Sequence, residues 1–377
     1  MAESYELRSY TEDLIPAVQA FNRRLVAGGL DRALTYPETH VPRFPPREGA
    51  RVCQQYFLLC DAGENVRGGF ILTQEQWSLR GETILLAHLR LPLSEGAVDQ
   101  RFKAVASRIF EAALALQPNL YALGMGGLHM PYTSRIRSLG WSMRAVPFYF
   151  KLRNAGKFLK TSPYLRRRPL IRMAADLAAA TGLGSLGVRA SQFLGSLNAS
   201  RLAKVEIEKV PCFGAWAGEI WEQAHGCYGL AAPRDGNTLN ARYPADEPRF
   251  LKLRFSREGR VFGWAVLLDT QMRGNKYFGD ARVGAIVDCF AHPENATPAI
   301  QAATRYLWDS GVDLVVTNQA HRAWRLAARR AGFLRSPSNY VFALSPEAAA
   351  MVHPFDRNFA TFFVTRGDGA GPERLME

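Results

Sequence analysis

The sequence predicts two α/β domains in tandem, each a mixed β-sheet flanked by helices, joined by a basic linker. With 377 residues, the chain is about twice as long as a common domain of roughly 100–200 residues. The two halves repeat one local pattern, and strand-like runs alternate with helix-like runs in each half, which indicates a sheet covered on both faces. We expect domains at 1–153 and 206–345, a linker at 154–205, and a tail at 346–377 that packs on the domains.

The internal repeat is clearest in two segments that each end in glycine and an aromatic residue. The segment from His129 to Trp141 aligns without a gap with the segment from His321 to Phe333, at a constant offset of 192. In both, a short helix is expected to end at the glycine, which can adopt the left-handed turn of a helix C-terminus. A strand-like run follows each segment.

The rest of each half follows the same order. Each first helix precedes a hairpin signal. This signal consists of an apolar run, a polar turn with glycine and a second apolar run. A buried strand then ends in proline and leads into another helix. The order in each half is strand, helix, hairpin, strand, helix, strand, helix, strand. The first helices are expected at 12–29 and 214–229, and the hairpins at 56–72 and 250–267. The buried strands are expected at 83–92 and 284–293, and the helices after them at 100–116 and 298–311.

Composition indicates a soluble cytoplasmic protein. Hydrophobic residues make up 47% of the chain and charged residues 21%, as in ordinary globular proteins. The five cysteines are odd in number and none forms a C-x-x-C pair, so reduced thiols are expected rather than a disulfide framework or a metal site. The N-terminus lacks the features of a signal peptide, and no run approaches the length of a membrane span.

The positive charge is concentrated in one segment. Residues 151–205 contain eleven Lys and Arg but one acid, Asp176, and so carry +10 of the net +13. A helix is expected at 168–182. Basic residues beside Leu and Ile suit an anionic membrane surface such as the inner membrane, and they also suit the phosphates of tRNA. A solvated connector between the domains is the third interpretation.

These segments resemble the GNAT superfamily (Gcn5-related N-acetyltransferases) in tandem. The opening run YELRSYTEDLIPAVQAF is similar to the first strand and helix of that family. The runs NTLNARYPADEP, AHRAWRLAARRAGFLRSPSNYVFAL and FFVTRGDGAGP are similar to tandem GNAT proteins found with bacterial exopolysaccharide genes. The resemblance implies transfer of an acyl group from acetyl-CoA or another acyl-CoA to an amine, such as an amino sugar in polysaccharide biosynthesis. A more distant resemblance to Fem-type transferases implies aminoacyl-tRNA as donor, and a non-catalytic scaffold or binding protein is a further alternative.

The family binds acyl-CoA through a turn after its fourth strand, where small residues let backbone N–H groups approach the pyrophosphate. In the first half this turn is 95–100 and contains the acids Glu95 and Asp99, which would repel phosphate. In the second half it is 296–301, which has Pro298 but no acid. The second half is therefore the candidate active half and the first is degenerate. The residues expected to contact the donor are Ala296, Thr297, Ala299 and Asn318, although Asn318 could instead close a turn.

GNAT chemistry requires a group that takes the amine proton. Asp288 is the leading candidate, because an acid within an apolar strand is either functional or held by a structural partner. His292 follows at the end of that strand, and His321 begins the late helix. Each of the two histidines has a structural alternative, as a loop residue and as a helix cap. The corresponding strand of the first half carries His88, and Cys289 is expected to be an inert buried thiol.

The acceptor is expected to contact Arg242 and Tyr243, which lie in a loop between the first helix and the hairpin of the second half. Arginine suits a carboxylate or phosphate because it can donate two parallel hydrogen bonds, and a surface salt bridge is the alternative. No metal-ligand motif is present. Asp368, between glycines in the tail, indicates a turn and leaves a contact with an ion or a sugar open.

Overall fold

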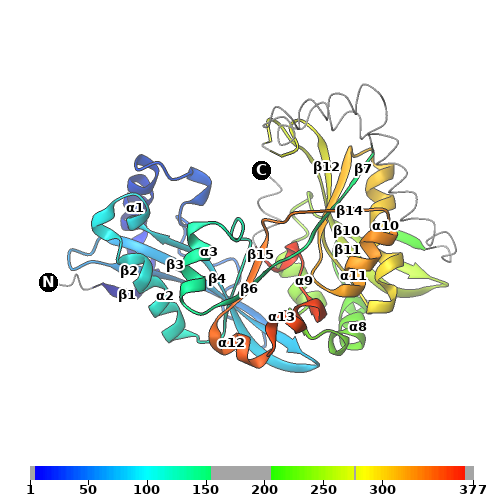
Figure 1. The fold of residues 1–377 in the computed structure, drawn as a ribbon, viewed down its shortest axis with the longest axis horizontal. Coiled ribbons are helices and arrows are strands. Elements are labelled where there is room, and N and C mark those ends of the chain that lie inside the picture. Colours follow the sequence, from blue (N-terminus) through cyan, green and yellow to red (C-terminus); the bar gives the residue numbers. More distant parts are fainter. Residues whose placement is uncertain (1–4, 154–204, 276, 370–377) are drawn as a thin grey trace.

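The computed structural model describes residues 5–153, 205–275 and 277–369. Two mixed β-sheets, each flanked by helices, lie beside one another (Figure 1). The predicted fold class is thereby confirmed. Within the described residues, no helix combines the length and the apolar character that crossing a membrane requires. The expected helix at 168–182, and the proposed contacts of the basic linker, lie outside the described residues.

The first sheet contains the N-terminal strands, blue and cyan in Figure 1. Helices α1 (Ile15–Ala27), α2 (Val105–Leu116) and α3 (Pro131–Ser138) flank it. A short pair, β9 (Leu230–Ala231) and β16 (Phe362–Phe363), extends it through β3. Its order is β1 (Glu6–Ser9), β2 (Val52–Cys60), β3 (Val66–Leu79), β4 (Glu82–Ser94), β5 (Leu120–Leu123), β15 (Val341–Leu344) and β6 (Ser142–Ala145).

The second sheet repeats this arrangement. Helices α8 (Ala215–Ala224), α9 (Gly236–Arg242), α10 (Ala296–Asp309) and α11 (Arg322–Arg330) accompany it. In both sheets the strand before the central helix pairs in parallel with the strand after it. The order is β8 (Glu206–Lys209), β10 (Leu251–Arg257), β11 (Arg260–Gln271), β12 (Arg282–Ala291), β13 (Leu314–Asn318), β7 (Phe148–Leu152) and β14 (Leu334–Ser336).

Local sequence explains where these helices lie and end. In α10 the buried residues Ala296, Ala299, Ala303 and Leu307 recur every three or four positions, so one face of the helix packs on the second core. The two repeated late helices, α3 and α11, are each followed by a glycine with a φ of +81° at 140 and 332. The left-handed conformation predicted from the repeat is therefore present in both halves.

The two halves exchange one strand each. Strand β7, from the first half of the sequence, lies in the second sheet between β13 and β14. Strand β15, from the second half, lies in the first sheet between β5 and β6. The ranges 1–153 and 206–345 therefore do not each contain a complete sheet. The exchange cannot be read from the local pattern, because an apolar strand has the same sequence signature whichever sheet receives it.

The exchanging segments meet where they cross between the sheets. Val146 and Pro147 connect β6 to β7, and the segment ending at Tyr340 connects β14 to β15. The backbone N–H of Val146 donates to the carbonyl of Tyr340 at 2.7 Å, and the N–H of Gln319 donates to the carbonyl of Pro147 at 3.1 Å. These hydrogen bonds join the two crossing segments to each other and to the end of β13.

The C-terminal segment folds back over the junction of the halves. It forms α12 (Pro346–Met351), α13 (Phe355–Asn358), the 3-10 turn η8 (Phe359–Thr361), β16 and then a second 3-10 turn, η9 (Arg366–Asp368). The end of this segment is red in Figure 1. Its apolar residues form one buried cluster with side chains of the first sheet, including Trp77 and Tyr121. The turn η9 lies against β12, so this segment brings its polar residues to the candidate site.

Candidate functional site

The two central parallel strands of the second half stop pairing next to Asp288. Strands β12 and β13 pair from Val283 with Leu314 to Ile286 with Thr317. On its other side, β12 pairs with β11 with a register shift just before Asp288, as expected for a β-bulge. Beyond this point β12 runs on to His292 and the start of α10. This is the part of the second half where the sequence placed the site.

Asp288 lies at the centre of a buried polar cluster. It is fully buried, and its carboxylate lies 3.4 Å from Nη2 of Arg234, which is also fully buried. The hydroxyl of Thr365 donates to Oδ1 at 3.1 Å, and the hydroxyl of Tyr243 donates to Oδ2 at 3.3 Å. Asp288 and Tyr243, which the sequence singled out separately, thus contact each other, and Thr365 of the tail joins them.

Further ion pairs extend this cluster to the first half. Arg234 Nη2 contacts Oδ1 of Asp368 at 2.6 Å. Arg242 contacts the same oxygen through Nη1 at 3.5 Å and contacts Oε1 of Glu75, on β3, through Nη2 at 3.0 Å. Glu75 also accepts hydrogen bonds from Tyr121 and Trp77, each 3.0 Å long. The cluster therefore joins both sheets and the tail.

The surroundings of Asp288 act on its pKa in opposite directions. Burial raises the pKa of the Asp288 carboxyl, and the nearby Arg234 opposes this rise. The centre of the cluster holds three carboxyl groups, on Glu75, Asp288 and Asp368, but two guanidinium groups. Arg234, Tyr243 and Thr365 surround the Asp288 carboxylate. Asp288 is therefore enclosed by its partners, and a role in taking a substrate proton would require substrate to reach it.

A small cavity of about 40 Å³ lies next to this cluster. That volume holds a few water molecules at most, since each requires at least roughly 10–15 Å³ of such space. Its lining comes from both halves and the tail: Arg43, Phe44, Thr73, Glu75, Arg90, Arg242, Tyr243, Phe250, Gly367, Asp368 and Gly369. Arg242 and Tyr243 thus face a polar cavity, from the end of α9 rather than from the loop that was predicted. Asp235, which caps this helix by accepting from the N–H of Thr238, explains the difference.

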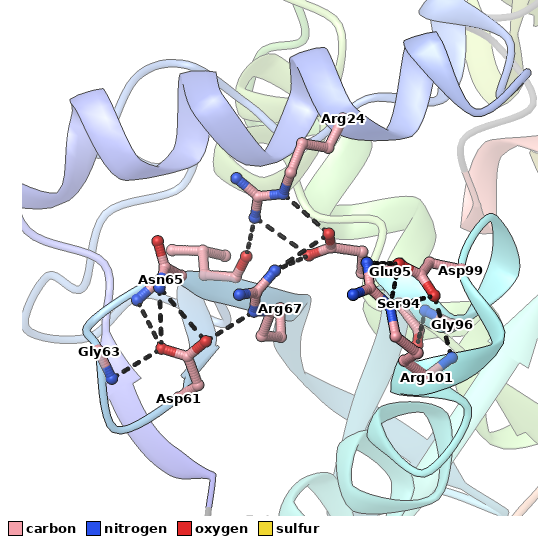
Figure 2. A network of polar contacts seen from close by, with 11 residues as sticks. Arg24, Asp61, Gly63, Asn65, Arg67, Ser94, Glu95, Gly96, Asp99 and Arg101 are labelled. Carbon is pink, nitrogen blue, oxygen red and sulfur yellow. Dashed lines mark hydrogen bonds and ion pairs between the residues drawn. The ribbon is translucent and has the colours of Figure 1, made fainter.

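The turn after β4, which corresponds to the donor loop in the first half, is filled by its own carboxylate (Figure 2). Glu95 is buried and accepts hydrogen bonds from Arg24 at 2.8 and 3.0 Å and from Arg67 at 3.0 and 3.1 Å. Arg67 is also held by Asp61 at 2.7 Å. A cavity of about 420 Å³ opens beside these residues, and Arg101 and Phe102 line it. Glu95 thus occupies the position between the guanidinium groups that an anion would take.

The backbone of this turn is also engaged internally. The N–H of Gly96 donates to the hydroxyl of Ser94, and the N–H groups of Val98 and Asp99 donate to the carbonyl of Glu95. The N–H of Arg101 donates to the Asp99 carboxylate at 3.0 Å. Groups that would cradle a pyrophosphate are therefore already bonded. This geometry supports the interpretation of the first half as degenerate.

We expect Glu95→Ala to lower the free energy of unfolding by about 2–4 kcal/mol, because it leaves two neighbouring guanidinium groups without their shared carboxylate. Glu111→Ala is the matched control, since Glu111 pairs with Arg108 on the surface, and we expect it to cost less than about 1 kcal/mol. Urea denaturation of the two variants measures both losses. Equal losses would show that the Glu95 contacts do not stabilise the fold.

The donor loop of the second half has a different structure. His292 begins a 3-10 turn, Pro293–Asn295, which leads directly into α10. Ala296 and Ala299 are buried and Thr297 is partly exposed. The two alanines could therefore contact a ligand only through their backbone groups. Asn295, the cap of α10, makes no side-chain capping hydrogen bond. The ring of His292 contacts the thiol of Cys227, with 3.3 Å between Nε2 and Sγ.

His321 is a helix cap. Its Nδ1 accepts from the N–H of Ala323 at 3.3 Å, and its ring packs edge-on against Tyr228. His129, its repeat partner, is exposed and does not cap α3, whose cap is Met130. His88 is buried and stacks on Tyr121, with 4.5 Å between the ring centroids. Burial keeps the pKa of His88 well below its ordinary value, and neighbouring arginines lower it further.

The capping role of His321 predicts a loss of stability in acid. Burial, with a smaller effect of Arg322, lowers the pKa of His321 from 6.5 to about 4. Between these values the unfolded chain binds more protons than the folded chain, so the free energy of unfolding falls as the pH falls, by up to about 3 kcal/mol. In His321→Asn, which retains a capping acceptor, we expect this part of the loss to disappear. Denaturation between pH 7 and pH 4 measures it, and parallel curves for the two proteins would contradict it.

Asn318 is engaged at the strand crossing. Its Nδ2 donates to the carbonyl of Val146 at 3.1 Å, and its Oδ1 accepts from Nε of Arg366 at 2.7 Å. The side chain is buried. These contacts place Asn318 between the exchanged segment and the tail. They favour the structural role for Asn318 over a contact with the donor.

Sequence reasoning did not single out Arg234 or Glu75. Arg234 follows Ala-Ala-Pro in a segment that reads as a loop, and Glu75 stands in the second strand of a hairpin. The available signal for Glu75 was an acid beside Gln74, Gln76 and Trp77 within a long strand. No local signal marks Arg234, because its partners Asp288 and Asp368 are 54 and 134 residues away. Among the described residues, no group of His, Cys, Asp and Glu could hold a metal ion.

Comparison with solved structures identifies the fold as that of N-acyltransferases. A probable N-acyltransferase from Enterococcus faecalis matches with a TM-score of 0.52 and 10% identity, over 92% of this chain and 74% of that one. A GCN5-related N-acetyltransferase from Anabaena variabilis matches with a TM-score of 0.52 and 10% identity, over 90% and 72%. The N-myristoyltransferase of Saccharomyces cerevisiae, in complex with myristoyl-CoA and inhibitors, matches with a TM-score of 0.50 and 11% identity, over 92% and 80%.

These similarities show the fold alone, because sequence identities near 10% do not show a shared activity or substrate. No family model and no curated protein sequence matches the chain. The protein therefore has the GNAT-like acyltransferase fold that the resemblance implied. The exopolysaccharide and Fem-type resemblances have no counterpart among these structures.

Proposed function

We propose that this protein is an N-acyltransferase that uses acyl-CoA as donor and an amine as acceptor. The observation that carries the proposal is the fold, which matches N-acyltransferases over at least 90% of the chain, one of them in complex with myristoyl-CoA. Acetyl-CoA and longer acyl-CoA molecules are both donors to test. The acceptor that we propose is an amino sugar in polysaccharide assembly.

The donor site that we propose lies at the start of α10. The N-terminus of this helix favours a phosphate group, because its first N–H groups and its dipole both attract negative charge. Thr297 is partly exposed in the first turn, and no acid stands in that turn. The equivalent turn of the first half is filled by Glu95. The contrast between the two turns supports the second half as the donor-binding half.

The acceptor region that we propose is the polar cavity between the halves. Arg242 and Tyr243 line it, and the enclosed Asp288 hydrogen-bonds to Tyr243. We keep Asp288 as the group that takes the amine proton, with Tyr243 beside it. Because the cavity holds a few waters at most, an amino sugar requires the surrounding residues to move. The tail turn at Thr365–Asp368 is the element in contact with Asp288 that would have to shift.

The enclosure of Asp288 favours a second candidate function, a non-catalytic binding protein built on the same fold. Its carboxylate contacts Arg234, Tyr243, Thr365 and the backbone N–H of Cys289. In this alternative the cluster serves to hold the two halves and the tail together. The two candidates differ in whether bound acyl-CoA turns over.

Calorimetric titration with acetyl-CoA and myristoyl-CoA tests donor binding. In Thr297→Glu a carboxylate enters the first turn of α10, which suits the helix dipole but repels a phosphate. We expect acyl-CoA to bind this variant at least about tenfold more weakly than Thr297→Gln, the neutral control of equal size. Equal affinity in the two variants, or no binding to the unmodified protein, would sink the donor site.

Turnover is tested by adding glucosamine or other amino sugars and measuring free CoA by chromatography, since the exposed thiols of Cys212 and Cys227 would interfere with thiol reagents. Release of CoA that depends on the acceptor and is lost in Asp288→Asn supports the enzyme. Binding of acyl-CoA without any release supports the non-catalytic candidate.

A further inference from the structure

The polar cavity between the halves takes part of its lining from one face of the first sheet. Thr73 and Glu75 of β3 line it, and so does Arg90 of β4. Successive residues of a strand point to opposite faces, so Thr73 and Glu75 lie on one face of β3. On β4, His88 is the register partner of Thr73 and stands two positions before Arg90. The half whose donor turn is filled by Glu95 therefore still presents polar side chains to this cavity.

Three arginines from different elements line the cavity. Arg90 comes from β4, Arg242 from the end of α9, and Arg43 from the loop that follows α1. Both halves hold this loop, because the N–H of Arg43 donates to Oε1 of Gln54 at 3.2 Å and its Nη2 donates to the carbonyl of Arg242 at 2.7 Å. Burial lowers the pKa of His88, and Arg90 and Arg242 lower it further. Positive charge is therefore concentrated on this side of the first sheet.

The two carboxyl groups of the lining are already held by protein donors. The hydroxyl of Tyr121 donates to Glu75 at 3.0 Å, and Nη2 of Arg234 donates to Asp368 at 2.6 Å. The lining itself contains three arginines and two carboxyl groups. It therefore has an excess of one positive charge, which a ligand group with one negative charge would balance.

The lining also has buried donors that can serve a ligand. Arg242 is buried, and its terminal nitrogens lie within ion-pair distance of Glu75 and Asp368. Neither nitrogen is in hydrogen-bond geometry with an acceptor among the described residues. The buried hydroxyl of Thr73 accepts from Nε2 of Gln54 at 3.0 Å, so it can donate its own proton. Buried donors normally have acceptors, and an anion in the cavity would supply them.

We propose that this cavity receives a carboxylate of the acceptor, so that the acceptor is an amine that also carries an acid group. The inference rests on the proposed function, because it names the substrate class of the same site. A volume of about 40 Å³ suits a single carboxylate group, which a guanidinium group binds through two parallel hydrogen bonds. Arg43 is exposed whereas Arg242 is buried, so the lining runs from the surface to the interior. Among amino sugars, those with a uronic carboxylate belong to this class.

The anion site is tested first without any acyl-CoA. The probes are acetate, inorganic phosphate and acetamide, which resembles acetate in shape but is neutral. Each is added to the full-length protein at one ionic strength set with chloride, and the rise of the thermal unfolding midpoint with concentration gives its dissociation constant. The variants are Arg43→Gln and Arg43→Lys, which keeps the charge. Arg47→Gln is the matched control, because it removes an exposed charge from the same loop without touching the cavity lining.

We expect acetate to bind at least about tenfold more tightly than acetamide, and Arg43→Gln to weaken acetate about five- to tenfold, as for loss of one charge-assisted hydrogen bond. Arg43→Lys should lose less, and Arg47→Gln should bind as the unmodified protein does. Equal binding of acetate and acetamide, or acetate binding that Arg43→Gln leaves unchanged, would overturn the proposal. Phosphate binding that is tighter than acetate binding and depends on Arg43 would overturn the choice of a carboxylate.

The acceptor itself is tested by comparing glucosamine with 2-amino-2-deoxyglucuronic acid, which has a carboxylate in place of the C6 hydroxymethyl group. With acyl-CoA present, we expect kcat/KM to be at least about tenfold higher for the acid, and this preference to shrink in Arg43→Gln. Equal kcat/KM for the two sugars would overturn the substrate class and leave the proposed function standing. Acetate binding without release of CoA by either sugar would contradict the proposed function and leave the anion site standing.

Discussion

The separated halves, residues 1–153 and 206–377, are expected not to fold independently. Each isolated half lacks the strand that lies between two of the remaining strands of its sheet. The first half lacks β15, which pairs with both β5 and β6, and the second lacks β7, which pairs with both β13 and β14. Loss of an internal strand leaves two unpaired edges. Each half also carries a strand without its sheet, so Tyr149 on β7 of the first half and Phe342 on β15 of the second lose the cores that bury them. We expect loss of cooperative unfolding by circular dichroism for either half alone.

Mixing the two halves is expected to restore the cooperative transition, because each then supplies the strand that the other lacks. A full-length chain cut within residues 154–204 after folding provides the control. The strand exchange should keep its halves together in size-exclusion chromatography. A half that unfolds cooperatively by itself with the stability of the whole chain would contradict the structural role of the exchange.

Arg234→Met is expected to lower the free energy of unfolding by about 3–5 kcal/mol. The substitution places an unbranched apolar side chain in a fully buried position and removes the charge that lies between Asp288 and Asp368. Breaking a buried ion pair from one side leaves the remaining charges unpaired in a medium that solvates them poorly. The loss is measured by urea denaturation near neutral pH.

The matched control is Arg330→Met, since Arg330 is exposed on α11, and its cost should stay within about 0.5 kcal/mol. Adding Asp288→Asn to Arg234→Met should recover part of the loss, because it removes the carboxyl group that the substitution leaves without a guanidinium ion pair, whereas Asp368 keeps its contact with Arg242. Equal effects of Arg234→Met and Arg330→Met would show that the cluster does not hold the halves together.

Local patterns predicted most of the secondary structure. The apolar spacing of α10 and the glycines at 140 and 332 each act over a few residues. The predicted end of the buried strand at proline holds in the second half, where β12 ends at Ala291, but it is wrong in the first, where β4 runs through Pro92 to Ser94. The alternation of these elements predicted the fold class, and the repeat showed that it occurs twice. Acids in the first donor loop predicted that this loop would not suit a phosphate, and the structure places Glu95 between two arginines there.

The candidate site was predicted in part. Asp288 and Tyr243 were singled out from the sequence and do contact each other. His321 was left between two roles, and its capping hydrogen bond now gives it a structural one. The partners of Asp288 were missed, because an arginine in a loop looks the same to sequence reasoning whether it is in solvent or fully buried.

The sequence by itself determined the kind of elements, their order and their duplication, because these depend on side chains a few positions apart. The tertiary structure alone decided which sheet receives β7 and β15, since an apolar strand fits the edge of either sheet and the choice depends on the whole assembly. It also decided which charges meet at Asp288 and which thiol meets His292. Those contacts join residues tens to more than a hundred positions apart, and packing of the complete chain is what brings them within a few ångströms.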